Sequence, residues 1–103
     1  MTPSSFKVNN AQQRICQVLM VLAGQEEFGV AQSAIAKAVK SSDSRLFNDL
    51  RNLQHAGFVE QLENKCWRLG PRLVQVSNAF HVGITRMKAR ALEIEQRYSR
   101  EPR

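Results

Sequence analysis

Apolar residues in the first half of the chain recur every three or four positions, the spacing that places them on one face of an α-helix. The first helix is expected from Asn10, a plausible N-cap, to a stop at Gly24. Its apolar face consists of Ile15, Val18, Leu19 and Leu22. A second helix is expected after the acidic turn at residues 25–29. Its apolar series consists of Val30, Ala34, Ile35, Ala38 and Val39.

A third helix and two short extended runs follow. The helix is expected to be capped by a serine at position 41 or 42 or by Asp43, and to end at Gly57. Its buried stripe consists of Leu46, Leu50 and Leu53. Apolar residues then occur in two extended runs, at 58–62 and 66–69, with three polar residues between them. This arrangement is typical of a β-hairpin.

A last helix is predicted from Pro71 to about Tyr98, because Pro is favoured at the first position of a helix. Apolar residues repeat in it every seven positions, and a second series follows the first with 3,4 spacing. This pattern predicts a coiled-coil seam between two copies, in which Arg90 and Glu95 would match in charge across a parallel pair. The predicted dimer interface consists of Phe80, Ile84, Met87, Ala91, Ile94 and Tyr98.

The order of these elements favours a mainly α fold with a small β-hairpin, a winged helix-turn-helix followed by a long C-terminal helix. The expected organisation is a flexible arm at 1–9, the winged domain at 10–70, the dimerisation helix at 71–98 and a disordered tail at 99–103. The alternative is a plain helical bundle. A bundle would not require the two extended runs to interrupt the helices.

Composition and charge favour an anionic partner. The chain has 103 residues, 15 Lys and Arg against 9 Asp and Glu, and a formal charge of +6. No apolar run is long enough to span a membrane and the N-terminus lacks a signal peptide, so we expect a cytoplasmic, nucleoid-associated protein with no membrane partner. Cys16 and Cys66 have hydrophobic neighbours and are expected to be buried free thiols.

Several segments resemble the DNA-binding domain of IclR-type transcriptional regulators. They are residues 28–39 (FGVAQSAIAKAV), the leucine stripe of the third helix, residues 55–60 (HAGFVE) and, most specifically, residues 67–73 (WRLGPRL). The resemblance implies a winged helix that dimerises and binds operator DNA ahead of a larger effector-sensing domain. Here the chain ends after the helix, so no small-molecule effector is expected, and the size suits a phage or mobile-element regulator.

Two departures from the family pattern lie around the helix-turn-helix turn. Lys40 and Ser41 stand where the family has a glycine. The third helix begins with Ser42, Asp43, Ser44 and Arg45 where the family has a Pro-Lys-Ser-Thr type of run. Because of these two departures, the resemblance does not predict which DNA sequence the protein binds.

The helix periodicity identifies candidate base contacts. With the leucine stripe facing the core, a turn of about 100° per residue puts several polar side chains on the opposite face or its flank. Arg can bond guanine in a bidentate way, and Asn can do so with adenine. The predicted base-contacting residues are Ser44, Arg45, Asn48, Arg51 and Asn52.

Candidate phosphate contacts come from helix starts, the turn and the wing, where such contacts position a protein without reading sequence. Lys65 at the hairpin tip is the natural wing residue, although Glu63 beside it makes the wing nearly neutral. The predicted phosphate-contacting residues are Gln32, Ser33, Lys40, Ser42, Lys65, Arg68 and Arg72.

These features predict a sequence-specific double-stranded DNA-binding protein, a small homodimeric transcriptional regulator. Neither His55 nor His81 has metal-ligand spacing to a cysteine, and no phosphate loop or nucleophilic triad occurs. We therefore expect no enzymatic activity, no metal and no cofactor. The competing interpretation is a protein-interaction adaptor, kept open by Asp43, Asp49 and Glu63 near the proposed DNA face.

Overall fold

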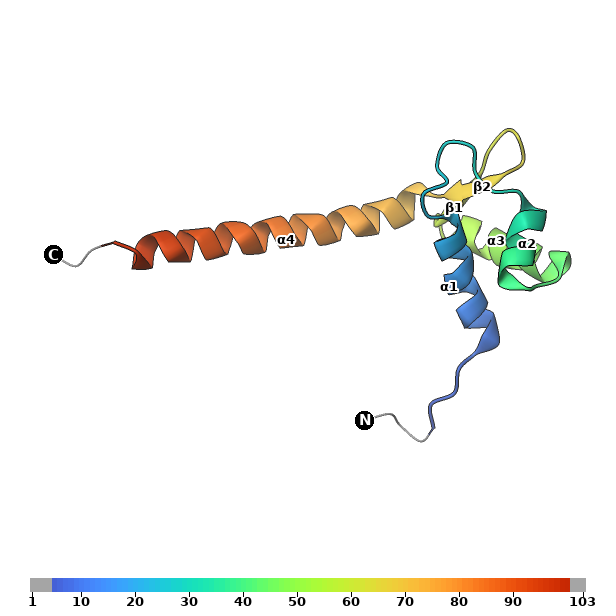
Figure 1. The fold of residues 1–103 in the computed structure, drawn as a ribbon, viewed down its shortest axis with the longest axis horizontal. Helices are drawn as coiled ribbons and strands as arrows, with labels where there is room; N and C mark the ends of the chain where they lie inside the picture. Colours follow the sequence, from blue (N-terminus) through green and yellow to red (C-terminus); the bar gives the residue numbers. More distant parts are fainter. Residues whose placement is uncertain (1–4, 101–103) are drawn as a thin grey trace. The chain divides into compact units, whose positions relative to one another are not determined.

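The computed structural model describes residues 5–100, and within them it has the element order predicted from the sequence (Figure 1). The fold class is confirmed: the chain is mainly helical, with an antiparallel hairpin and a long C-terminal helix. Among the described residues, 5–73 form one compact unit and 74–100 form a second. The elements are α1 (Asn10–Leu22), α2 (Gln32–Val39), α3 (Asp43–His55), β1 (Val59–Gln61), β2 (Trp67–Leu69) and α4 (Pro71–Tyr98).

Side-chain caps fix the starts of α1 and α3. The predicted N-cap of α1 was wrong by one residue: Asn9 is the cap, and its side chain accepts a hydrogen bond from Gln12 N at 2.9 Å. An extended backbone at Asn9 lets its amide oxygen reach this N–H, whereas Asn10 is already helical. At α3 the cap is Ser42, whose hydroxyl accepts from Arg45 N at 3.3 Å.

The turn before α2 forms an isolated β-bridge with the hairpin that the helical spacing did not predict. Val30 was predicted in the second helix, but it pairs with Trp67 in an isolated antiparallel bridge. Val30 N donates to Trp67 O at 2.8 Å, and Trp67 N donates to Val30 O at 2.9 Å. Gly29 precedes the bridge with φ +71, and a Cβ there would lie 2.8 Å from Trp67 O. The close backbone approach therefore places Val30 in a β-bridge rather than in the helix, and α2 starts two residues after it.

The core of the first unit joins all three of its complete helices to the hairpin. Trp67 is the largest fully buried side chain, and the strand register places it opposite Gln61. The expectation of buried thiols was wrong for Cys16, which is exposed on the solvent side of α1, while Cys66 is half-buried; both thiols are free. The buried apolar residues are Val18, Leu22, Ile35, Ala36, Leu46, Leu50, Leu53, Val59 and Trp67.

An ion pair joins α1 to α3 beside this core. Arg14 Nε donates to Asp49 Oδ2 at 2.5 Å, and a second guanidinium nitrogen donates to Asp49 Oδ1 at 3.2 Å. The hydrogen bonds to Asp49 raise the pKa of the Arg14 guanidinium above its ordinary value, against the opposing effect of burial. The two side chains are only 17% and 12% exposed, so solvent screens the pair poorly.

The turn between α2 and α3 uses a left-handed lysine. Lys40 has φ +54 and ψ +51, the conformation that glycine adopts most easily. Lys40 N donates to Lys37 O and Ser41 N donates to Ala36 O, which is the hydrogen-bond pattern of a Schellman motif. The turn therefore closes without the glycine typical of IclR-type proteins, at the cost of strain at Lys40.

The helix α4 continues without interruption from Pro71 to Tyr98, as predicted. None of its residues is buried in the single chain. Its start depends on Gly70, because a Cβ there would lie 2.5 Å from Gly57 O. The predicted arm at 1–9 and the predicted tail at 99–103 lie partly outside the described residues, which do not include 1–4 and 101–103.

Replacement of Asp49 by Ala should lower the free energy of unfolding by about 3 kcal/mol, because Arg14 would lose its acceptor in a poorly solvated position. The matched control is Glu60→Ala, which removes an ion pair with Arg68 whose side chains are 36% and 38% exposed. That change should cost only about 0.5 kcal/mol. Urea unfolding curves measure both, and equal losses would contradict the structural role of the Arg14–Asp49 pair.

Replacement of Lys40 by Gly should raise the free energy of unfolding by about 1 kcal/mol, because glycine adopts the left-handed conformation without steric cost. Lys40→Ala removes the same charged side chain but keeps a Cβ, so it should bring no such gain. Thermal or urea unfolding compares the two variants. A gain in both would assign the effect to the lysine charge rather than to the backbone.

Candidate nucleic-acid interface

The outer face of α3 presents a set of polar and basic side chains. The structure places all five predicted base-contacting residues on the surface, on one helix. The opposite face is buried, with Leu46 and Leu50 fully enclosed. Contact of these side chains with bases stays a prediction. The five are Ser44, Arg45, Asn48, Arg51 and Asn52.

Local contacts already occupy part of this face. Asn52 Nδ2 donates to Asn48 O at 2.9 Å, so a bidentate contact from Asn52 would need its amide to turn away from the helix backbone. The Arg51 guanidinium lies over the Phe47 ring, 5.9 Å from its centroid. Phe47 was not among the predicted site residues, because a phenyl ring has no hydrogen-bonding group to pair with a base edge.

The acidic residues of α3 lie away from its outer face. Asp49 was predicted near the DNA face, and this was wrong: it is buried and ion-paired with Arg14. The cause is that Asp49 lies three residues after Leu46 and four before Leu53, so it falls on the helix face that these buried leucines share. Asp43 is exposed in the first turn, where a carboxylate favours the positive end of the helix dipole. From Ser44 onward, the exposed charges of α3 are basic.

The start of α2 can accept an anion. Ala31 is its N-cap and makes no side-chain hydrogen bond, and the first turn carries no acidic residue. The first N–H groups of the helix therefore have no side-chain acceptor. Ser33 is exposed in this turn, while Gln32 is half-buried and its Nε2 donates to Asp43 O at 3.4 Å. Gln32 thus links α2 to α3, which leaves Ser33 as the freer of the two predicted contacts.

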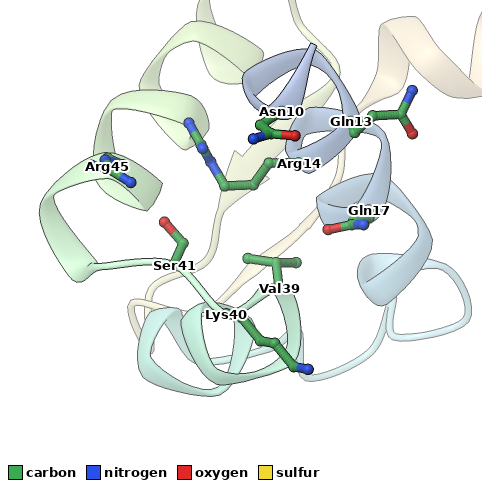
Figure 2. A pocket seen from close by; sticks show the side chains of 8 residues that line it. All are labelled: Asn10, Gln13, Arg14, Gln17, Val39, Lys40, Ser41 and Arg45. Carbon is green, nitrogen blue, oxygen red and sulfur yellow. The ribbon is translucent and has the colours of Figure 1, made fainter. Parts of the chain in front are cut away.

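A pocket of about 310 Å³ lies beside the α2–α3 turn (Figure 2). Side chains from α1, the end of α2, the turn and α3 surround it, including the predicted contacts Lys40 and Arg45. The α1 wall of this pocket was not predicted, although the sequence carries a signal for it: the polar positions there recur at i, i+3, i+4 and i+7. These α1 residues are Asn10, Gln13, Arg14 and Gln17.

The hairpin tip is held by its own hydrogen bonds. Lys65 is exposed with φ +72, and its N–H donates to Leu62 O at 3.0 Å. Asn64 Oδ1 accepts from Cys66 N, and Asn64 Nδ2 donates to Phe28 O, which ties the tip to the turn before α2. Lys65 is therefore presented on an ordered loop.

The two arginines near the hairpin differ in what they already contact. Arg68 pairs with Glu60 across the strands at 2.6 Å and donates to Glu26 O at 3.1 Å. Most of its charge is therefore balanced within the protein. Arg72 is exposed in the first turn of α4, and its backbone N–H donates to Gly57 O at 3.2 Å.

The second unit presents an apolar seam. The predicted interface residues Phe80 and Met87 are 67% and 66% exposed, and Ile94 and Tyr98 are exposed as well. Ile84 is half-buried and Ala91 is exposed. Large apolar side chains that are this exposed are typical of a surface that binds another protein chain. Pairing of two copies stays a prediction.

No helix among residues 5–100 has the length and apolar character needed to cross a membrane. Over the same residues, no three His, Cys, Asp or Glu side chains come together as a set of metal ligands.

Comparison with known proteins gives a fold but no family. No protein-family model matches the chain, and no curated protein matches it. Wild-type ZitR from Lactococcus lactis is a similar solved structure, with 22% sequence identity and a TM-score of 0.50. A point mutant of the same protein has 19% identity and a TM-score of 0.49. The match with the wild type covers 94% of this chain but 65% of ZitR, so this chain spans less than two thirds of that protein. The likeness shows a winged-helix fold, and the resemblance to IclR-type regulators is not confirmed.

Proposed function

We propose that this protein is a dimeric, sequence-specific double-stranded DNA-binding regulator whose helix α3 enters the major groove. The observation that carries the proposal is the outer face of α3, exposed, polar and basic, on the second helix of a helix-turn-helix. The winged-helix fold shared with ZitR supports it. The burial of Asp49 removes a negative charge that would have repelled phosphate from this face.

Base reading is assigned to the outer face of α3. Arg45 and Arg51 have the fork of donors that fits guanine, and Asn48 has an exposed side-chain amide that fits adenine. Ser44 and Asn52 are assigned single hydrogen bonds to base edges. Specificity in this account comes from α3 alone.

Phosphate contacts are assigned to elements on either side of α3. The N–H groups and Ser33 at the start of α2, together with Lys40 and Ser42 in the turn, would hold one stretch of backbone. Lys65 on the ordered hairpin tip would hold another. Arg72 is available for this role, whereas Arg68 serves mainly the hairpin itself because Glu60 pairs with it.

Dimerisation is assigned to the seam on α4. A helix with no buried residue gains little stability from its own chain, since most helical stability in proteins comes from packing of an apolar face. Pairing of two seams would bury Phe80, Met87 and Ile94 and bring two copies of α3 to an inverted repeat, about 34 Å apart or a multiple of that distance.

The adaptor alternative has lost part of its support. It relied on acidic residues near the DNA face, and Asp49 is not on that face. Glu63 and Asp43 remain exposed. Salt dependence separates the two functions: DNA binding should weaken steeply as salt rises, because neutralised phosphates release counterions, and an adaptor should bind random duplex hardly at all.

Selection of bound sequences from a random DNA pool should enrich an inverted repeat. Arg45→Ala should relax specificity at one position of each half-site and cost about 1–3 kcal/mol in binding the selected duplex. Lys65→Ala should instead weaken selected and random duplexes equally and lower the salt slope by about one. The charge-matched control is Arg86→Ala on α4, which should keep the wild-type motif. Failure of the wild-type protein to enrich any motif would refute the proposed function.

Met87→Lys should convert the dimer to a monomer, because a charge would enter the seam. Met87 is exposed in the single chain, so the change should leave the fold of each chain intact. Leu92→Lys is the matched control: Leu92 is also exposed on α4, but it lies off the seam. Sedimentation at micromolar concentration should show a dimer for the control and a monomer for Met87→Lys. A monomeric wild-type protein would contradict the seam.

A further inference from the structure

One aromatic side chain on α3 is left out of the core. The helix has four large apolar residues, and Leu46, Leu50 and Leu53 are buried. The fourth, Phe47, is 45% exposed and is not part of the apolar cluster or of the residues packed against it. Since phenylalanine forms helices less readily than leucine, Phe47 brings no evident benefit to the fold at this position.

Phe47 lies beside the proposed base readers. It precedes Asn48 in the chain and lies one helical turn before Arg51, whose guanidinium covers its ring at 5.9 Å. Residues four apart on a helix share one face, so Phe47 and Arg51 meet the same surface. An apolar ring and a guanidinium are therefore presented together at the edge of the outer face.

The major groove offers one apolar group that matches such a ring. Thymine displays its 5-methyl group there, and phenylalanine is among the side chains that contact it. The other groups on the base edges are hydrogen-bond donors and acceptors, which a phenyl ring cannot satisfy. An arginine one turn away can at the same time bond a neighbouring guanine.

We infer that Phe47 is a specificity-determining residue that packs on the 5-methyl group of a thymine next to the base read by Arg51. The inference rests on the proposed function and adds a contact that polar readout alone would not supply. Deoxyuridine isolates this contact, because uracil lacks the methyl group and keeps every hydrogen-bonding group of thymine. Any loss of affinity on this replacement therefore reports the loss of an apolar contact with the methyl group.

The experiment uses the duplex selected by the wild-type protein, with each thymidine replaced in turn by deoxyuridine. At one thymine per half-site, the replacement should weaken wild-type binding about fourfold, the effect of exposing one buried methyl group. Phe47→Ala should bind the thymine and uracil duplexes equally at that position. Phe47→Leu keeps an apolar side chain and should retain part of the difference.

Phe28→Ala is the matched control, because Phe28 is 72% exposed in the turn before α2 and should leave the discrimination unchanged. A selected motif in which every thymine tolerates uracil would overturn this inference while leaving the proposed function standing. The inference is also overturned, and the proposed function again left standing, if Phe47→Ala discriminates between thymine and uracil as the wild type does. That result would show that the ring does not contact the methyl group. Failure to select any motif would overturn the proposed function and this inference with it.

Discussion

The rotation of α3 about its own axis is the constraint on which the account depends. Leu46, Leu50 and Leu53 turn one face of the helix into the core, and Asp49 on the same face bonds Arg14 of α1 with two hydrogen bonds. A turn of the helix by one residue would leave the Arg14 charge without its acceptor, a costly state in a poorly hydrated position. Apolar packing and the ion pair thus favour the same orientation of the outer face.

The rest of the winged unit supports this orientation from two sides. The strained Lys40 closes the turn that sets α3 against α2, and Gln32 adds a hydrogen bond from α2 to the start of α3. On the other side the Val30–Trp67 bridge joins the hairpin to the turn before α2. These contacts hold the start of α2 and the hairpin tip on the same unit as α3. The proposed phosphate contacts therefore lie on either side of the proposed base contacts.

Most of the fold could be predicted because local patterns determine it. The three- and four-residue spacing of apolar side chains, together with the glycines and the proline at element ends, predicted every helix in the described residues. The two extended runs predicted both strands. Long-range contacts could not be predicted in this way. Asp49 was misplaced because its partner Arg14 lies 35 residues earlier, and Val30 was misplaced because its strand partner Trp67 lies 37 residues later. The exposed face of α3 followed from periodicity, but Phe47 did not, since its exposure depends on how neighbouring elements leave that flank open.

Taken together, these contacts describe a winged unit whose helix α3 has an exposed polar and basic face, and a second unit whose helix carries exposed apolar side chains. The central claim is that the outer face of α3 meets DNA. Backbone amide NMR spectra of the full chain, recorded while the selected duplex is added, test it most directly. The account predicts shifts concentrated at Ser33, at the exposed α3 residues from Ser44 to Asn52 and at Lys65. Shifts confined to α4 beyond Val74, with α3 unchanged, would contradict it.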